Sequence, residues 1–351
     1  MIGRYLFTLI IVCLCNSISW TQDLRQHKDK ESLLDHLTEM ASSTLDLEVD
    51  LDALFSDRKY MNYKMAVASF NFGDEVWTDS IYVKTRGVYR NRLCDNPPLK
   101  LKYPKKALKR RGLKKQNELK VVYPCKEKGE YQNYIYKEYL VYRMYNILTD
   151  KSLRVQLIDF TIKDALGKNE PIESIGFLIE HREEIIKRLK GVKSDKKCMK
   201  PSHLSNFDYS LFQVFQYFIG NTDWLIPTCK NSEVITLKDG LMIPIPYDFD
   251  FSGMVDTDYA VPQSAFGLKD IKERYFLGHK KKLKDLRPVF DLFQEKRAEL
   301  TQLVKDFELL PKYERKSMIK YINSFYKILE NPKKVKKEFV HPMAESMAAD
   351  F

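Results

Sequence analysis

The sequence predicts an α+β protein built as two lobes, the first rich in strands and the second mainly helical. Strand-like runs dominate the chain up to Glu180 and are interrupted by one long helical pattern. Beyond Pro201, helical patterns prevail around one short hairpin. The stretch 187–200 between them is polar and charged, which is typical of a boundary. We therefore expect an N-terminal β-rich lobe over 22–185 and a C-terminal lobe over 186–351.

The elements of the first lobe follow from the spacing of apolar residues. Leucines recur at helical spacing in 28–42. Two β-branched and aromatic runs, 65–72 and 76–84, flank the turn at Gly73 and indicate a hairpin. In 99–103 leucines alternate with lysines, as on a strand with one buried face. The remaining predicted elements are a strand over 118–123, a long helix over 133–148, and strands over 155–162 and 175–180.

In the second lobe, the stretch 209–219 is a strongly apolar helical pattern that ends at Gly220-Asn221, a common helix stop. A second hairpin is expected over 234–237 and 242–247, around Asp239-Gly240. The tail over 282–340 is predicted to be helical, with interruptions at Pro311 and Pro332.

Composition excludes some protein classes and the first residues suggest a compartment. The 351 residues carry a net charge of +11 with 44% hydrophobic content, which excludes disordered and fibrous chains. Arg4 precedes an apolar run over 5–15 and a polar stretch over 16–22, the pattern of a secretory signal. We expect a signal peptide over 1–21 and a secreted, periplasmic or cell-surface mature protein without a transmembrane segment. A membrane anchor or a buried N-terminal helix is the alternative.

The cysteines agree with export. Two of the six lie in the expected signal, and none of the others forms a CxxC pair, so disulfides are the simplest interpretation. The bridge that we favour joins Cys94 and Cys125, because each lies near a proline turn and both flank one basic segment. With Cys198 and Cys229, three connectivities remain open.

The densest acidic motif places Asp248 and Asp250 among aromatic residues directly after a strand-like run. Carboxylates are costly to bury unless a cation neutralises them, so a hard divalent metal is the natural partner. The alternative is a turn in which Asp248 caps backbone amides and Asp250 faces water.

A second acidic loop begins at the end of the apolar helix. Asp223 follows Gly220-Asn221, and Asn231 lies eight residues beyond Asp223. An Asp followed by an Asn and then by an acidic metal motif is the layout of a phosphotransferase site, where the first Asp positions the acceptor hydroxyl. The alternative is an Asx-turn that caps the helix.

The first lobe offers partners for a phosphate. Lys100 and Lys102 project from one face of their strand, and Glu138 on the following helix is placed to pair with one of them. Such a pair, facing Asp223 and Asp248 across one cleft, is what a phosphotransferase requires. Outward-pointing lysines would contradict it, and solvated surface side chains are the alternative.

Together these motifs resemble the spore-coat CotH kinase-like family, and more closely uncharacterised exported Bacteroidetes proteins. The resemblance covers roughly Ile81 to Tyr259. The segments that carry it are Val83-Lys84-Thr85-Arg86-Gly87, Pro98-Leu99-Lys100-Leu101-Lys102, Ile175-Gly176-Phe177-Leu178-Ile179-Glu180, Gly220-Asn221-Thr222-Asp223 and Tyr247-Asp248-Phe249-Asp250. The chain departs from the kinase pattern in having no glycine-rich phosphate loop before the lysine strand.

The resemblance implies a bilobal protein-kinase-like fold that binds ATP and Mg²⁺ or Mn²⁺. By motif, Asp223 is the catalytic acid of the loop, and Asn231, Asp248 and Asp250 are the metal ligands. The implied cofactor-binding residues are Lys100, Lys102, Glu138 and Glu180.

Three functions remain open from the sequence. The first is an exported atypical kinase that transfers phosphate from ATP to a protein or other hydroxyl acceptor. The second is a non-catalytic, pseudokinase-like binding module that keeps a structural metal site. The third is a carbohydrate-active enzyme that uses two of the acids Asp223, Asp248 and Asp250 as acid and base.

The segment 105–115 holds seven Lys or Arg residues in eleven positions. It contains no aromatic residues on which bases could stack, so we expect no nucleic-acid partner. An exposed, solvated loop is one interpretation. Contact with an acidic protein, an acidic polysaccharide or lipid headgroups is the functional alternative.

Overall fold

The computed structural model describes residues 30–39, 44–73, 75–192, 201–278 and 282–340. Residues 1–30 separate from 31–351 as a unit of their own, and the description concerns the second unit. The expected signal peptide, Cys13, Cys15 and Cys198 lie outside the described residues.

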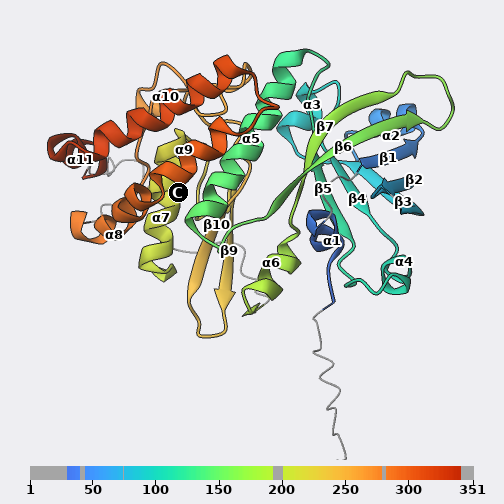
Figure 1. Ribbon diagram of the computed structural model, residues 1–351, viewed down its shortest axis with the longest axis horizontal. Helices are drawn as coiled ribbons and strands as arrows, with labels where there is room; N and C mark the ends of the chain where they lie inside the picture. The colour runs from blue at the N-terminus through green and yellow to red at the C-terminus, as the bar shows by residue number, and fades with distance from the viewer. Residues whose placement is uncertain (1–29, 40–43, 74, 193–200, 279–281, 341–351) are drawn as a thin grey trace, which may run out of the picture. The chain divides into compact units, whose positions relative to one another are not determined.

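The first part of the chain forms a closed barrel (Figure 1). Its strands follow the order β1-β2-β3-β4-β5-β7-β6. All neighbouring pairs are antiparallel except β1 and β6, which pair in parallel and close the barrel. The strands are β1 (Thr44–Val49), β2 (Lys64–Asn71), β3 (Val76–Thr85), β4 (Leu99–Lys102), β5 (Glu118–Val122), β6 (Val155–Asp164) and β7 (Ile172–Ile179).

This closure corrects the expected fold. The α+β class stands, but the bilobal protein-kinase-like arrangement with a separate β-rich lobe is wrong, because the strands form a closed barrel of mixed orientation. The physical reason is β1, which the sequence interpretation did not predict. Its alternating side chains bury Leu45, Leu47 and Val49, and its two edges pair with β2 and β6.

Apolar side chains from alternate strand positions fill the barrel. Phe70, Leu101 and Phe160 belong to this core, to which α1 (Leu33–Glu39) and α2 (Leu51–Ser56) also contribute. Two short helices lie in the connections between barrel strands, one between β3 and β4 and the other between β4 and β5. They are α3 (Tyr89–Leu93) and α4 (Lys105–Arg110).

A second core surrounds α5 (Gly129–Leu148), which lies between the barrel strands and the C-terminal helices (Figure 1). This core contains Phe177 of β7 together with Phe218 and Phe325 of the C-terminal helices. The helix α5 therefore shares one core with the barrel strand β7 and with those helices. The other elements are α6 (Arg182–Arg188), β8 (Gly191–Val192), α7 (Asn206–Ile219), β9 (Ser232–Leu237), β10 (Met242–Pro246), α8 (Leu283–Glu295), α9 (Arg297–Lys305), α10 (Lys312–Leu329) and α11 (Pro332–Phe339), with 3₁₀ turns at Pro201–His203 and Ser264–Phe266.

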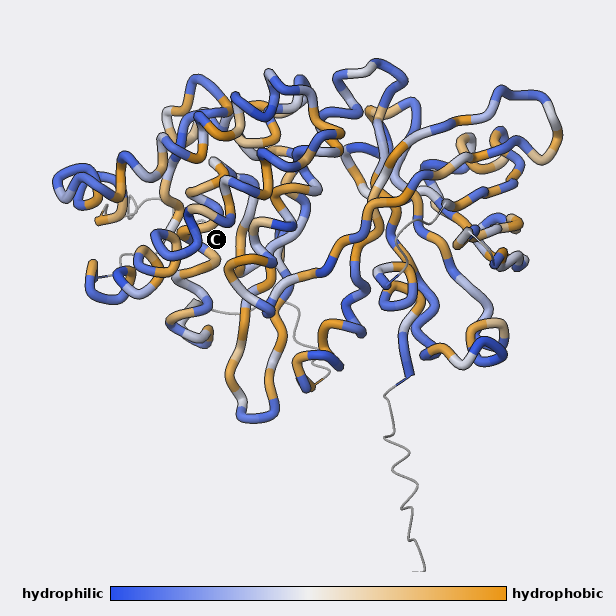
Figure 2. Tube along the Cα trace, viewed as in Figure 1, coloured by the Kyte–Doolittle hydropathy of each residue, from blue (hydrophilic) through white to orange (hydrophobic). Residues whose placement is uncertain are grey.

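Several local predictions are confirmed. β2 pairs with β3 and β9 with β10 as hairpins, and α10 and α11 begin after Pro311 and at Pro332. Figure 2 shows the arms of the β9–β10 hairpin as largely hydrophobic and its turn as hydrophilic. The Cys94–Cys125 disulfide that we favoured is present.

The basic segment 105–115 is partly a helix instead of the expected loop. Ala107 and Leu108 of α4 are buried, whereas Arg111 pairs with Asp79. In the part of the chain that the structure describes, no helix combines the length and the apolar character needed to cross a bilayer.

Candidate functional site

The loop after β10 carries Asp248 in a left-handed backbone conformation, with φ of 64°. Asp and Asn tolerate this region better than other side chains except Gly, and strained residues concentrate at functional sites. The backbone N–H of Asp248 donates to Tyr142 Oη on α5 at 2.9 Å. The loop is thereby fastened to α5, and it leads directly to the buried Asp250.

Glu138, Asp248 and Asp250 form what we call the acidic cluster, and Arg90 of α3 is the cation placed among them. Arg90 Nη1 lies 3.3 Å from Glu138 Oε2, and Arg90 Nε lies 3.9 Å from Asp250 Oδ2. Tyr259 Oη donates to Asp250 Oδ2 at 3.1 Å. Among the described residues, buried Glu138 Oε1 has no hydrogen-bond partner.

The guanidinium of Arg90 thus contacts two of the three carboxylates. Burial raises the pKa of Glu138 to about 8, and Asp250 and Asp248 act in the same direction, while Arg90 and, more weakly, Arg86 oppose them. Burial also raises the pKa of Asp250 to about 7, together with Asp248 and, more weakly, Asp223. The cluster carries more negative charge than its surroundings compensate, and such charge is costly to bury without a further cation.

A half-buried lysine that the sequence interpretation missed, Lys120, also interacts with Asp248. Burial lowers the pKa of Lys120 on β5, and the like charge of Arg86 adds to this, whereas Glu233 and Asp248 oppose it. Lys120 Nζ lies 5.6 Å from the centre of the Tyr247 ring. We call Lys120 and Arg86 the basic pair. The signal that could have found Lys120 is its position between Leu119 and Val121 in a short strand, on the opposite face from both.

The structure brings Asp223 and Asn231 together. Asn231 Nδ2 donates to Asp223 Oδ2 at 2.8 Å and to the Asp223 carbonyl at 2.7 Å. Lys230 Nζ pairs with Asp223 Oδ1. Asn231 has a left-handed backbone, with φ of 49°, and its carbonyl accepts from the N–H of Tyr247 at 3.2 Å. The two predicted loops thus meet, and Asp223 is near enough to Asp250 to act on its pKa.

A glycine explains how the first of these loops leaves α7. Gly220 ends α7 with φ of 66°, and a Cβ there would lie 2.1 Å from Tyr321 Oη on α10. The Gly220 carbonyl accepts from the N–H of Gly253 at 3.0 Å. The segments around Asp223 and Asp250 are therefore fixed to each other through backbone that no larger residue could replace.

The remaining predicted residues have partners of their own, although Lys100 is the direct cross-strand neighbour of Lys120 and lies near enough to act on its pKa. Lys100 Nζ pairs with Glu118 Oε2 at 2.6 Å, and Lys102 Nζ lies 5.2 Å from the centre of the Tyr63 ring. The expected pair between a strand lysine and Glu138 is not formed, because Arg90 occupies that place. Glu180 is fully buried and bound by Arg154 and Arg188, so both of its carboxylate oxygens are used within the protein.

The donor set suits a metal that is only partly held by protein. Within the described ranges, no three His, Cys, Asp or Glu side chains converge closely enough to make a metal site. Mg²⁺ is usually bound by one or two carboxylates together with water and substrate phosphates. Asp248, Asp250 and Asn231 fit that pattern, and the unpartnered Glu138 Oε1 marks remaining acceptor capacity in the cluster.

Comparisons with known proteins give limited results. No protein-family model matches the chain, CotH included, and no curated protein matches it in sequence. A solved structure of a proinflammatory kinase, CtkA, from Helicobacter pylori is similar to it with 13% identity and a TM-score of 0.40, over 76% of this chain and 94% of that chain. At this identity and TM-score, the similarity indicates nothing about mechanism.

Proposed function

We propose that this protein is a metal-dependent phosphotransferase that moves phosphate from ATP to a hydroxyl of a protein or another acceptor. The observation that carries the proposal is the meeting of two opposite charge excesses at Asp248. Burial costs the ionised Glu138 more than Arg90 and Arg86 compensate, and it costs the charged Lys120 more than Glu233 and Asp248 compensate. A divalent metal bound to a polyphosphate supplies both a cation and an anion, so one ligand would relieve both imbalances.

Each group then has a distinct role. Asp248, with Asp250 and Asn231, would hold Mg²⁺ or Mn²⁺, which when bound neutralises phosphate charge. Lys120 and Arg86 would bind phosphate oxygens, a role that the sequence interpretation gave to Lys100 and Lys102. Arg90 keeps Glu138 and Asp250 in place, since it lies between them.

Asp223 is the group proposed to act on the acceptor. The acceptor oxygen bonds to the γ-phosphorus, the bond from that phosphorus to the bridging oxygen of ADP breaks, and Asp223 takes the hydroxyl proton. Asn231 and Lys230 orient the carboxylate for this, from either side. The Cys94–Cys125 disulfide supports the accompanying proposal that the protein works outside the cytoplasm.

One observation favours a second candidate, a non-catalytic module that binds nucleotide or metal without turnover. Both carboxylate oxygens of Asp223 already have a partner, Lys230 on one and Asn231 on the other. An acid held in this way is well oriented, but it has no unoccupied oxygen to take the hydroxyl proton unless one of these partners moves away.

The test has two stages, both on the protein with its Cys94–Cys125 disulfide intact. In the first, ATP with Mn²⁺ should raise the thermal unfolding midpoint of the wild type, and Asp248→Asn should lose this shift. The matched control is Asp239→Asn, the same change at the exposed turn of the β9–β10 hairpin. No shift at millimolar nucleotide overturns the proposal.

In the second stage, transfer of labelled γ-phosphate is measured with protein and small hydroxyl acceptors. Asp223→Asn should abolish transfer and keep the thermal shift, which separates its role from binding. Nucleotide binding without any transfer by the wild type would establish the non-catalytic module instead.

A further inference from the structure

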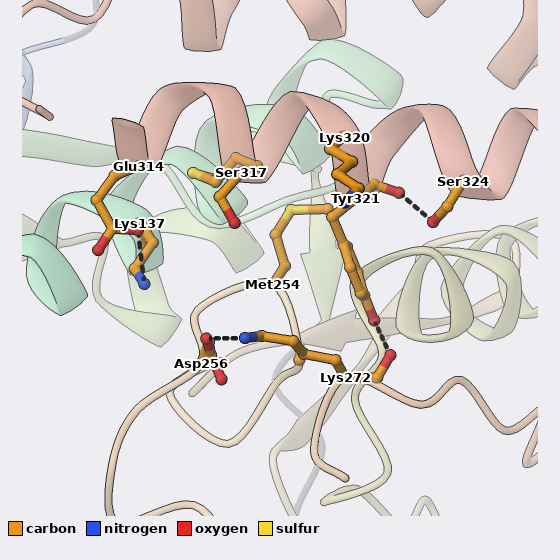
Figure 3. Close-up of a pocket in the computed structure, with 11 residues that line it drawn as sticks. Lys137, Met254, Asp256, Lys272, Glu314, Ser317, Lys320, Tyr321 and Ser324 are labelled. Carbon is orange, nitrogen blue, oxygen red and sulfur yellow. Dashed lines mark hydrogen bonds and ion pairs between the residues drawn. The ribbon is translucent and has the colours of Figure 1, made fainter. Parts of the chain in front are cut away.

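A cavity of about 310 Å³ lies beside α10 and is separate from the candidate site (Figure 3). Lys137 on α5 and Lys272 form part of its wall. The rest comes from the segment 253–256, which follows Asp250, and from the face of α10 between Glu314 and Ser324. Arg90 and the three carboxylates of the acidic cluster do not line it. The volume is in the range of sites that hold small organic molecules.

The cavity presents a buried ammonium group. The Lys137 side chain is 4% exposed, and its Nζ lies 3.4 Å from Glu314 Oε2. Charge-assisted hydrogen bonds are usually about 2.7–2.9 Å long, so this partner is loosely held. The Tyr134 ring, whose centre lies 5.2 Å from Nζ, is a second neighbour. An ammonium has three N–H donors, so one distant carboxylate and one ring leave capacity for another acceptor. Burial lowers the pKa of Lys137, which is the sign of an incompletely compensated cation.

The charges on the wall limit what can bind there. Three lysines, Lys137, Lys272 and Lys320, face two carboxylates, Asp256 and Glu314. Asp256 and Lys272 pair with each other at 2.5 Å, opposite Lys137 in Figure 3. The wall therefore has an excess of one positive charge. It favours a monoanion, because the two carboxylates would repel a dianion.

The rest of the wall is suited to an apolar body. Met254, Met318 and the Tyr321 ring supply its apolar surface, and Ser317 adds a hydroxyl. Gly253 lets the chain approach α10, since a Cβ there would lie 2.8 Å from Tyr321 Oη. The lining thus combines one unbalanced cation with a compact apolar surface.

We propose that this cavity binds a small organic carboxylate, whose anionic group pairs with Lys137 and whose apolar part packs on Met254, Met318 and Tyr321. This site does not depend on the proposed phosphotransferase activity. Inorganic phosphate and neutral amides of the same shape are the ligands that it should reject.

The test is calorimetric titration of the full protein with benzoate and hexanoate, compared with benzamide and inorganic phosphate. At least one of the two carboxylates should bind saturably, and the two comparison compounds should not. Lys137→Met should weaken binding at least tenfold. Lys316→Met makes the same charge change on α10 outside the cavity lining, and it should leave the affinity unchanged.

Ser317→Phe serves if Lys137→Met fails to fold. Ser317 is exposed at the cavity mouth, so the variant should fold, and its ring should fill the space and abolish binding. The proposal is overturned if neither carboxylate binds, if benzamide binds as well as benzoate, or if Lys316→Met weakens binding as much as Lys137→Met.

Discussion

Two fully buried glutamates in this protein have opposite surroundings. Glu180, at the end of β7, accepts from Arg154 Nε at 3.0 Å and Arg188 Nε at 3.1 Å on one oxygen, and from Arg188 Nη2 at 2.9 Å and the Arg154 N–H at 3.1 Å on the other. Among the described residues, one oxygen of Glu138 pairs with Arg90 at 3.3 Å and the other has no hydrogen-bond partner.

The difference separates a carboxylate whose oxygens are both used within the fold from one that keeps unused acceptor capacity. Glu180 is shared by two guanidinium groups and its acceptor capacity is used. Glu138 shares the guanidinium of Arg90 with Asp250, and Arg86 acts on it only from a distance. A buried polar group without a hydrogen-bond partner costs stability, and such groups are found more often at functional sites than elsewhere.

The largest expected effect comes from removing Arg90, whose guanidinium contacts both Glu138 and Asp250. Arg90→Met should cost about 3–5 kcal/mol of unfolding free energy, because it leaves buried carboxylates without a counterion. Arg188→Met should cost clearly less, since Arg154 still holds Glu180. Urea denaturation of both variants at pH 8 measures the difference. Equal losses would break the comparison between the two glutamates.

The disulfide should come next. Cys94 directly follows α3, which carries Arg90, and its bridge to Cys125 spans 31 residues. Replacing both cysteines by Ala should cost about 2–4 kcal/mol by the loop-closure argument. It should also weaken Mn²⁺ binding, because Arg90 loses its tether. Wild type treated with a reductant is the control, and unchanged stability after reduction would refute the role of the bridge.

Neutral substitutions at the two glutamates should affect the unfolding free energy differently at pH 8 without metal. Glu180→Gln should lower the unfolding free energy by about 1.5–3 kcal/mol, because its hydrogen bonds to charged donors weaken. Glu138→Gln should leave it unchanged or higher, because it removes a poorly compensated charge. Thermal and urea unfolding report both. A loss at Glu138→Gln equal to that at Glu180→Gln would contradict the account.

The pH dependence of stability should follow the raised pKa values. The pKa values of Glu138 and Asp250, about 8 and about 7 in the folded protein, exceed their ordinary values of 4.5 and 3.8. The folded state thus holds protons that the unfolded state releases, so stability should fall as pH rises from about 4 to 8. Glu138→Gln with Asp250→Asn should reduce this slope.

Some slope should remain in that double variant, because burial also raises the pKa of Glu184 to about 7. Unfolding free energies across the pH range check this. An unchanged slope would show that neither Glu138 nor Asp250 holds the excess proton.

The smallest effect should come from the exposed end of the site. Lys230, whose side chain is 52% exposed, pairs with Asp223. Lys230→Met should change stability by at most about 1 kcal/mol, as for other exposed ion pairs. The variant should keep the rise in thermal unfolding midpoint that ATP and Mn²⁺ cause. Its rate of phosphate transfer should differ from that of the wild type. A large loss of stability would show that the pair between Lys230 and Asp223 stabilises the fold, as the contacts of Glu180 do.

Local sequence patterns predicted the hairpins, the long helices, the preferred disulfide and the position of Asp223 and Asn231 in the loop between the apolar helix and the second hairpin. They did not predict barrel closure, because β1 is short and its pairing with β6 joins residues more than a hundred positions apart. A kinase-like arrangement was inferred from motif order, which says nothing about whether the sheet closes.

Two residues of the candidate site also escaped prediction. Arg90 lies in a short run with two other cations nearby and has the pattern of a surface residue, yet packing of α3 buries it to 8% exposure. Lys120 sits in a strand whose burial depends on β4 and β7 on either side. Burial of a charged side chain is a property of the assembled fold, so local spacing carries little signal for it.

The central claim is that the acidic cluster binds a divalent cation, and calorimetric titration with Mn²⁺ tests it most directly. The account predicts a single saturable site in the wild type, tighter when ATP is present, with affinity at least tenfold weaker in Asp248→Asn and unchanged in Asp239→Asn. Absence of saturable binding, or equal binding by Asp248→Asn and the wild type, would contradict it.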